Sequence, residues 1–93
     1  MSNKVIKRTG KVVDFDKEKI IEAIKKAMTA ELATVNLKVA EKIADEIALY
    51  VDAMGDNPIS IEEIEKLVYD KLISHRLKNV ARAYEGYRAI REY

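Results

Sequence analysis

The sequence has no cysteine and no tryptophan, and its 93 residues include one histidine, one proline and three glycines. Without cysteine there is no disulfide framework, no thiol nucleophile and no cysteine zinc site. Scarce proline and glycine predict mostly regular structure with short loops. No apolar run approaches the about 20 residues of a membrane span, and the start Met-Ser-Asn-Lys lacks the apolar core of a signal peptide. We therefore expect a cytoplasmic protein with no membrane partner.

The charges are nearly balanced, with 17 Lys and Arg against 16 Asp and Glu and a formal net charge of +1. A dedicated nucleic-acid binder usually carries a clear basic excess, so a nucleic-acid partner is not expected. Hydrophobic residues make up 48% of the chain, and 93 residues are too few for two separate cores. We therefore predict one domain over residues 1–93.

The segment 4–15 contains two short β-prone runs on either side of Thr9-Gly10. Glycine adopts the positive φ that tight turns require, so the segment predicts a β-hairpin that turns at these two residues. In that register Ile6 lies opposite Val13, and both share a face with Phe15. The other face then carries Val5, Lys7, Val12 and Asp14.

Four later segments have the apolar spacing of amphipathic helices. Asp16 is a candidate N-cap for the first helix, and Gly55 is a stop signal for the second. Ser60 and Glu63 form a capping box for the third, and Ile59 with Ser60 is a candidate third strand. The predicted helices span residues 17–29, 36–54, 61–74 and 78–92. The fold class is α+β, with a small two- to three-stranded sheet packed against a bundle of four helices.

No phosphate-binding loop motif and no nucleophile arrangement is present, so we expect no catalytic residues. The hairpin instead carries the cations Lys7, Arg8 and Lys11 around its turn. On spacing alone they either protect an exposed strand edge from aggregation or reach a phosphate chain. Asp16 is either only an N-cap or, with Lys19, part of an anion and base site at the helix start.

The last predicted helix carries two tyrosines and two arginines on one face, Tyr84, Tyr87, Arg88 and Arg91. Aromatic residues at this spacing are often core residues, and Tyr84 is interpreted in that way. Guanidinium groups are too costly to leave unpaired in a core. Arg88 and Arg91 therefore either extend to solvent, pair with a carboxylate or bind an anionic ligand.

Four blocks of the sequence resemble, in the same order, the ATP-cone domain, whose opening reads roughly V-x-K-R-x-G and then F-D-x-x-K-I. The resemblance covers about residues 4–92, and four ordered blocks are more specific than any one of them. The blocks are Val5-Ile6-Lys7-Arg8-Thr9-Gly10, Val13-Asp14-Phe15-Asp16-Lys17-Glu18-Lys19-Ile20, Ile59-Ser60-Ile61-Glu62-Glu63-Ile64 and Ala83-Tyr84-Glu85-Gly86-Tyr87-Arg88-Ala89-Ile90-Arg91.

This resemblance implies a non-catalytic allosteric domain that binds ATP or dATP, with Mg²⁺ accompanying the triphosphate. In the family the hairpin acts as a lid over the nucleotide. Binding regulates an attached or partner enzyme, such as a ribonucleotide reductase of the anaerobic class or a related archaeal or bacterial host, by changing oligomeric state. We therefore expect a larger host enzyme and a homo-oligomer as partners.

Transferred position by position, the resemblance also implies a set of nucleotide contacts. Val5 would meet the base through its backbone, Asp16 would read the base edge and Ile20 would pack on the nucleoside. Lys7 would meet phosphate, and Lys19 would reach ribose or phosphate. The full set, with the arginines of the last helix completing the phosphate site, is Val5, Lys7, Arg8, Asp16, Lys19, Ile20, Arg88 and Arg91.

The sequence also departs from the family pattern. Val13 stands where some reductases use an acidic side chain near the adenine, and Glu65 about where some place a histidine. Repressors of the family carry a four-cysteine zinc ribbon before the cone, so this cysteine-free chain is not a complete repressor of that kind. Two other functions stay open: a degenerate cone that serves as a protein-interaction module, and a weak nucleic-acid-binding domain that uses the hairpin cations together with Arg88 and Arg91.

Overall fold

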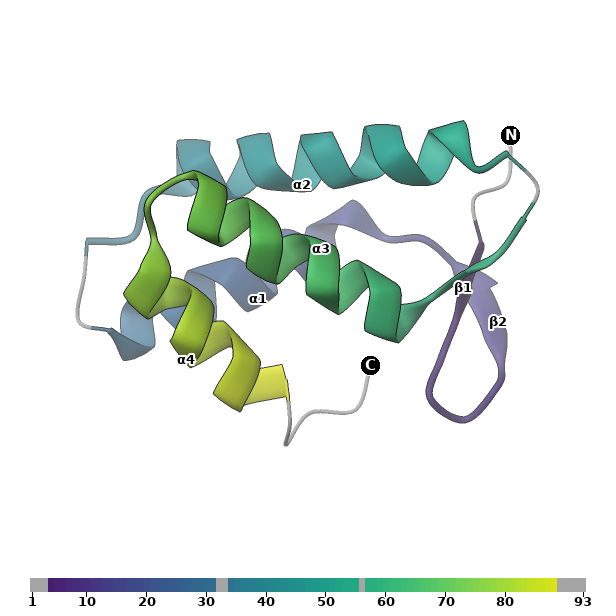
Figure 1. Ribbon diagram of the computed structural model, residues 1–93, viewed down its shortest axis with the longest axis horizontal. Coiled ribbons are helices and arrows are strands. Elements are labelled where there is room, and N and C mark those ends of the chain that lie inside the picture. The colour runs from purple at the N-terminus through teal and green to yellow at the C-terminus, as the bar shows by residue number, and fades with distance from the viewer. Residues whose placement is uncertain (1–3, 32–33, 56, 89–93) are drawn as a thin grey trace.

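A computed structural model describes residues 4–31, 34–55 and 57–88 of the chain. In these residues the predicted α+β class is confirmed, with a three-stranded sheet at one end of a four-helix bundle (Figure 1). The elements in chain order are β1 (Lys4–Ile6), β2 (Val12–Asp14), α1 (Lys17–Ala30), α2 (Leu37–Ala53), β3 (Ile59–Ser60), α3 (Ile61–Ser74) and α4 (Lys78–Arg88).

The sheet has the strand order β2-β1-β3, so the first strand of the chain is the central one. β1 pairs antiparallel with β2 and parallel with β3, and the predicted third strand is therefore confirmed. Val5 is opposite both Val13 and Ile59, and its side chain is fully buried. The centre of the sheet thereby joins the hairpin to the segment that leads into α3.

The predicted hairpin register is wrong by one residue. Lys4 pairs with Asp14 and Ile6 pairs with Val12, because the turn contains three residues, Arg8-Thr9-Gly10, rather than two. The Lys7 N–H donates to the Lys11 carbonyl at 2.8 Å, and the Gly10 N–H donates to the Lys7 carbonyl at 2.8 Å. Gly10 has φ +91°, the positive value that the extra turn residue requires.

The one-residue shift changes which side chains face the core. Val5 and Val13 now share a face, on which Val5 is buried and Val13 and Phe15 pack against the core as half-buried residues. Ile6 and Val12 share the other face, where Val12 is 49% exposed. The prediction that Ile6 shares a face with Val13 and Phe15 is therefore wrong.

The helices form a bundle in which α1 packs against α2 and α4, and α3 packs against α2 and α4. Their apolar stripes meet in one core, as the helical spacing predicts. Met54 and Leu67 lie at the edges of these stripes and are half-buried. The buried helix residues are Ile20, Ile21, Ile24, Ala27, Met28, Ala40, Ile43, Ala44, Ile47, Val51, Ile61, Ile64, Glu65, Val68, Leu72, Val80, Ala81 and Tyr84.

Side-chain caps begin three of the helices where the sequence places polar residues. The Asp16 carboxylate accepts from the Glu18 N–H at 3.0 Å, and the Ser60 hydroxyl accepts from the Glu63 N–H at 3.2 Å. The Asn36 side chain accepts from the Val39 N–H at 3.2 Å. The observed helices differ from the predicted ranges by one residue at either end of α2 and at the end of α1. Residues 89–92 of the last predicted helix lie outside the described residues.

A left-handed residue separates α3 from α4. Arg76 has φ +64°, and the Leu77 N–H donates back to the Leu72 carbonyl at 2.8 Å, which closes the end of α3 in the manner of a Schellman motif. Glycine usually occupies this position because it has no side chain to oppose a positive φ. Across the described residues, no helix combines the length and the apolar character needed to cross a membrane.

Candidate functional site

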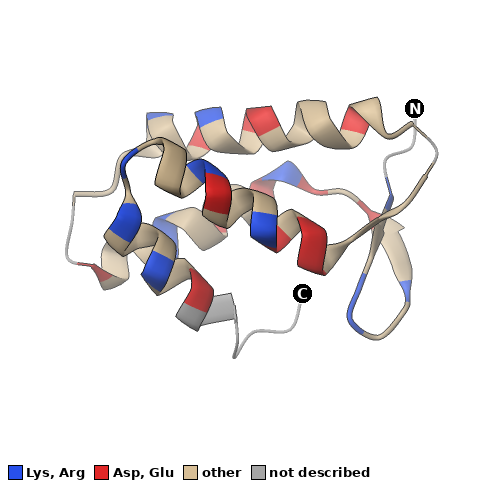
Figure 2. Ribbon diagram, viewed as in Figure 1, with Lys and Arg blue, Asp and Glu red and all other residues tan. Residues whose placement is uncertain are grey.

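The hairpin turn carries three cations, and two of them have no carboxylate partner among the described residues. Lys7 is half-buried, whereas Lys11 is exposed, and neither lies within ion-pair distance of an acidic group in the described part of the chain. Figure 2 shows basic residues on both arms of the turn. The tip of the hairpin is therefore a local concentration of positive charge in a chain whose charges otherwise nearly balance.

Arg8, the third cation, is held by α3. Its Nη2 lies 2.5 Å from Glu65 Oε2, and its Nη1 lies 3.6 Å from Glu62 Oε2. The hydrogen bond to Glu65 raises the pKa of the Arg8 guanidinium, and the nearby negative charges of Glu65 and Glu62 act in the same direction. The contact fastens the turn to a helix that begins more than fifty residues later in the chain.

Tyr84 of α4 lies near Arg8 of the hairpin turn. Its ring is 5% exposed, and its hydroxyl lies close enough to Arg8 to influence the pKa of the guanidinium. The interpretation of Tyr84 as a core residue is confirmed. Arg88 ends α4 one helical turn after Tyr84, but its side chain lies outside the described part of the structure, as does all of Arg91.

The start of α1 supplies the remaining predicted residues. Asp16 and Lys19 are both exposed, and the Asp16 carboxylate caps the helix. Val5 and Ile20 have 0% and 3% of their surfaces exposed, so both lie in the core. Asp16 adjoins the open end of the hairpin, and the strands place the cationic turn about 10 Å further along. The site is thus an acidic group and a cationic turn at opposite ends of one hairpin.

Sequence reasoning missed the pairing of Arg8 with Glu65. One signal was available, because Glu65 follows Ile61 by four positions and precedes Val68 by three, on the apolar stripe of α3. The apolar stripe of a helix faces the core, so an acidic residue on that stripe is buried. A buried carboxylate needs a cationic partner. The partner itself lies too far along the chain to be read from the spacing.

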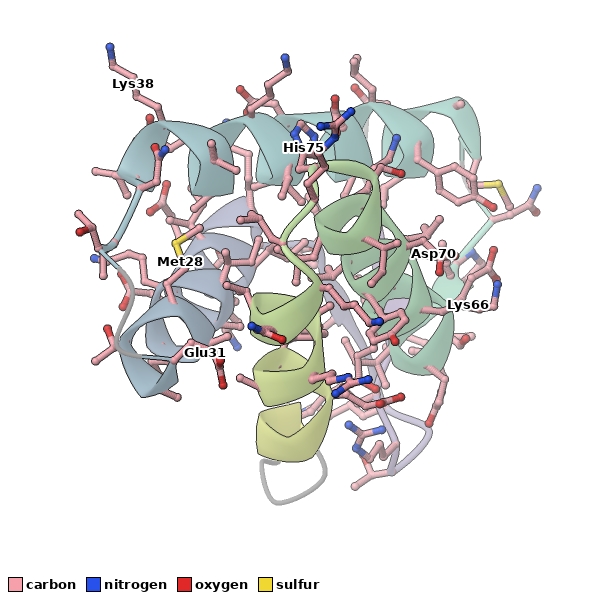
Figure 3. The ribbon with its side chains drawn as sticks, turned by 60° about the vertical axis from the view of Figure 1, so that its left-hand side comes forward. Met28, Glu31, Lys38, Lys66, Asp70 and His75 are labelled. Atoms are coloured by element: carbon pink, nitrogen blue, oxygen red, sulfur yellow. The ribbon has the colours of Figure 1, made fainter. Side chains whose placement is uncertain are left out.

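A surface cavity of about 420 Å³ lies elsewhere, where the end of α1 meets the connection between α3 and α4. It is lined by Glu31, Arg76, Leu77, Lys78, Asn79 and Val80, none of which belongs to the predicted nucleotide contacts. The labelled Glu31 lies at the end of α1, close to α4 (Figure 3). Within the described ranges, no three His, Asp or Glu side chains come together in a way that suits a metal ion.

Comparison with known proteins identifies the class. The family model described as ATP cone domain matches residues 3–93, and the chain belongs to this family. ATP cones are regulatory nucleotide-binding domains, so the resemblance read from the four blocks is confirmed.

The chain is similar to parts of two kinds of ribonucleotide reductase and to a transcriptional repressor. The chain is 40% identical over 91 residues to the anaerobic ribonucleoside-triphosphate reductase of Haemophilus influenzae, covering 95% of this chain and 12% of the reductase. It is 38% identical over 101 residues to the vitamin B12-dependent ribonucleoside-diphosphate reductase of Thermoplasma acidophilum, and this match covers 99% of this chain and 13% of the reductase. It is 34% identical over 94 residues to the transcriptional repressor NrdR of Thermosipho melanesiensis, and this match covers 96% of this chain and 60% of the repressor.

Proposed function

We propose that this chain is a non-catalytic allosteric domain that binds ATP and dATP and regulates a larger host enzyme, such as a ribonucleotide reductase, by changing its oligomeric state. The observation that carries the proposal is the cationic hairpin turn of Lys7, Arg8 and Lys11 in a chain that belongs to the ATP-cone family. The high identity to two reductases of different type supports a reductase as the host.

The phosphate groups of the nucleotide bind at the hairpin turn. Lys7 and Lys11 have no acidic partner in the described residues, so a phosphate group need not displace a carboxylate from them. Charge-assisted hydrogen bonds of this kind are about twice as strong as neutral ones. Mg²⁺ would accompany the triphosphate and neutralise part of its charge, and the described residues offer no cluster of three acidic or histidine side chains that would hold the ion by themselves.

At the base end, Asp16 distinguishes adenine from guanine. Its carboxylate accepts hydrogen bonds only, and one of its oxygens already accepts from the Glu18 N–H. The exocyclic N6 amino group of adenine is a donor, whereas guanine presents the O6 acceptor at the same position. A carboxylate that faces this edge attracts adenine and repels guanine.

ATP and dATP differ by one hydroxyl group. A net hydrogen bond contributes about 1 kcal/mol, so the domain alone discriminates between them only several-fold. Regulation requires that the two nucleotides stabilise different states of the host, because equal affinity for both states shifts no equilibrium. Assembly of the host therefore amplifies a small difference in binding.

Titration calorimetry with ATP, dATP, GTP and CTP tests the proposal. ATP and dATP should bind more tightly than GTP and CTP, and Lys7→Ala should weaken ATP about tenfold or more while adenosine binding changes little. Lys66→Ala is the matched control, since Lys66 is 77% exposed and points outward from α3 next to Asp70 (Figure 3). That variant should bind ATP as the unaltered chain does.

Two results would contradict the proposal. Equal affinity for all four nucleotides would refute adenine recognition, and the absence of binding to any of them would favour a degenerate cone that acts as an interaction module. Weak, steeply salt-dependent binding to DNA in place of ATP binding would favour the nucleic-acid alternative.

A further inference from the structure

Glu65 is the charged side chain that the fold buries most completely among the described residues, with 4% of its surface exposed. It lies on α3 between the core residues Ile61 and Val68. A buried carboxylate without a partner is strongly unfavourable, because the low-dielectric surroundings replace its hydration. The position of Glu65 on the apolar stripe therefore depends on a cation supplied by another element.

Arg8 of the hairpin turn supplies that cation. Its guanidinium is 2.5 Å from Glu65 and 3.6 Å from Glu62, and 36% of the Arg8 side chain is exposed. Lys7 and Lys11 flank Arg8 at the turn without an acidic partner in the described chain. Of the three turn cations, Arg8 is thus the one that an internal carboxylate already occupies.

We propose that Glu65 competes with the triphosphate for Arg8: in the nucleotide-free chain it holds the hairpin turn on α3, and ATP binding draws Arg8 from Glu65 to phosphate. This inference rests on the function proposed above and concerns the regulation of the same site. Glu65 thereby sets the affinity for triphosphates and couples their binding to movement of the hairpin.

The competition follows from charge. When Arg8 turns to phosphate, the buried Glu65 carboxylate loses its ion pair with Arg8 and lies close to a polyanion, and both the loss of this ion pair and the like charges oppose binding. Adenosine carries no phosphate and leaves Arg8 on Glu65. The penalty therefore applies to ATP and not to adenosine.

A different arrangement makes the opposite prediction. A guanidinium has five N–H donors, so Arg8 has enough donors to bridge Glu65 and phosphate at the same time. Glu65 would then orient Arg8 for the ligand, and its loss would weaken ATP binding. The sign of the effect of one substitution distinguishes the two arrangements.

The test compares Glu65→Gln with Glu62→Gln. Glu65→Gln keeps the size and a hydrogen-bond acceptor but removes the charge, whereas Glu62 is 60% exposed and weakly paired with the same guanidinium. By calorimetry, Glu65→Gln should bind ATP about tenfold more tightly, and adenosine unchanged. Glu62→Gln should change ATP affinity less than about threefold. Hydrogen exchange of residues 4–14 in the nucleotide-free chain should become faster in Glu65→Gln alone.

ATP affinity that is unchanged or lower in Glu65→Gln would overturn the inference, and so would unaltered exchange in the hairpin. Should Glu65→Gln lose cooperative unfolding, Glu65→Met removes the charge with a side chain of similar volume, and the same outcomes apply to it. The two proposals fail separately. If the unaltered chain binds no adenine nucleotide, the proposed function fails, while the exchange measurement still decides whether Glu65 holds the hairpin.

Discussion

Asp16 has a structural role in the fold and a second role in the proposed site, and two substitutions separate them. Its carboxylate accepts from the Glu18 N–H at 3.0 Å and caps α1. Asp16→Ala removes both the cap and the carboxylate. Asp16→Ser keeps a capping oxygen but removes the charge and the reach that a contact with adenine requires.

The magnitudes follow from these two roles. Loss of an N-cap costs about 1 kcal/mol, which lowers the Tm of a domain of this size by about 4–8 °C. Asp16→Ala should show this decrease, and Asp16→Ser should retain most of the Tm. The base contact is a hydrogen bond to a charged group at an exposed position, so both variants should bind ATP about tenfold more weakly.

Differential scanning calorimetry and nucleotide titration measure the two effects independently. Asn36→Ala is the matched control, because Asn36 caps α2 through the Val39 N–H and is not among the predicted nucleotide contacts. It should lower the Tm by a similar amount and leave ATP affinity unchanged. If Asp16→Ser binds ATP as tightly as the unaltered chain, the carboxylate does not read the base and Asp16 is only a cap.

Three further predictions concern stability. Ile24→Ala empties a fully buried position and should cost about 2–5 kcal/mol in urea unfolding, whereas Leu49→Ala, at a site 70% exposed, should stay within about 0.5 kcal/mol. Arg76→Gly relieves the backbone strain at φ +64° and should raise the free energy of unfolding in urea by about 0.5–1 kcal/mol. A lower free energy of unfolding would contradict the strain at Arg76. The hydrogen bond that Tyr50 donates to Glu63 raises the pKa of Tyr50 above its ordinary 10.0, so its stabilising contribution is present below about pH 10 and is lost as the pH rises through the raised pKa. Urea midpoints measured across this range should fall less steeply for Tyr50→Phe, and equal slopes would contradict this role of Tyr50.

The helical part of the fold was predictable because burial repeats with the helix itself. Ile20, Ile24 and Met28 recur at multiples of one turn, and no information from distant residues is needed to place them on the core side. The caps are equally local, since Asp16 and Ser60 bond within their own first turns. These features therefore agree between sequence and structure.

The hairpin register depended on a choice that the sequence leaves open. A two-residue turn at Thr9-Gly10 and a three-residue turn that includes Arg8 both give Gly10 a positive φ. Packing decides between them, because Val5 is buried beside Ile59 and the three-residue turn places the core-packing Val13 and Phe15 on the same face as Val5. Contact with the core, which includes residues far along the chain, thus agrees with the register of a local hairpin.

The arrangement of the candidate site was predictable only in part. Lys7, Asp16 and Lys19 lie on or next to the hairpin in the sequence, so their proximity follows from chain connectivity. The pairing of Arg8 with Glu65 depends on how α3 packs against the sheet, which is a tertiary property. The spacing of Glu65 on α3 could have shown that this carboxylate needs a cation, but not which cation supplies the charge.

The central position of β1 has a consequence for the order in which the chain folds. The antiparallel pairing of β1 with β2 closes a turn of only three residues, whereas the parallel pairing of Val5 with Ile59 closes a loop that contains both α1 and α2. Closing the longer loop has the larger entropic cost, so it becomes favourable only after those helices have packed. We expect the hairpin and the first two helices to form early, and the strand that precedes α3 to join in the last cooperative step, when Arg8 also meets Glu65.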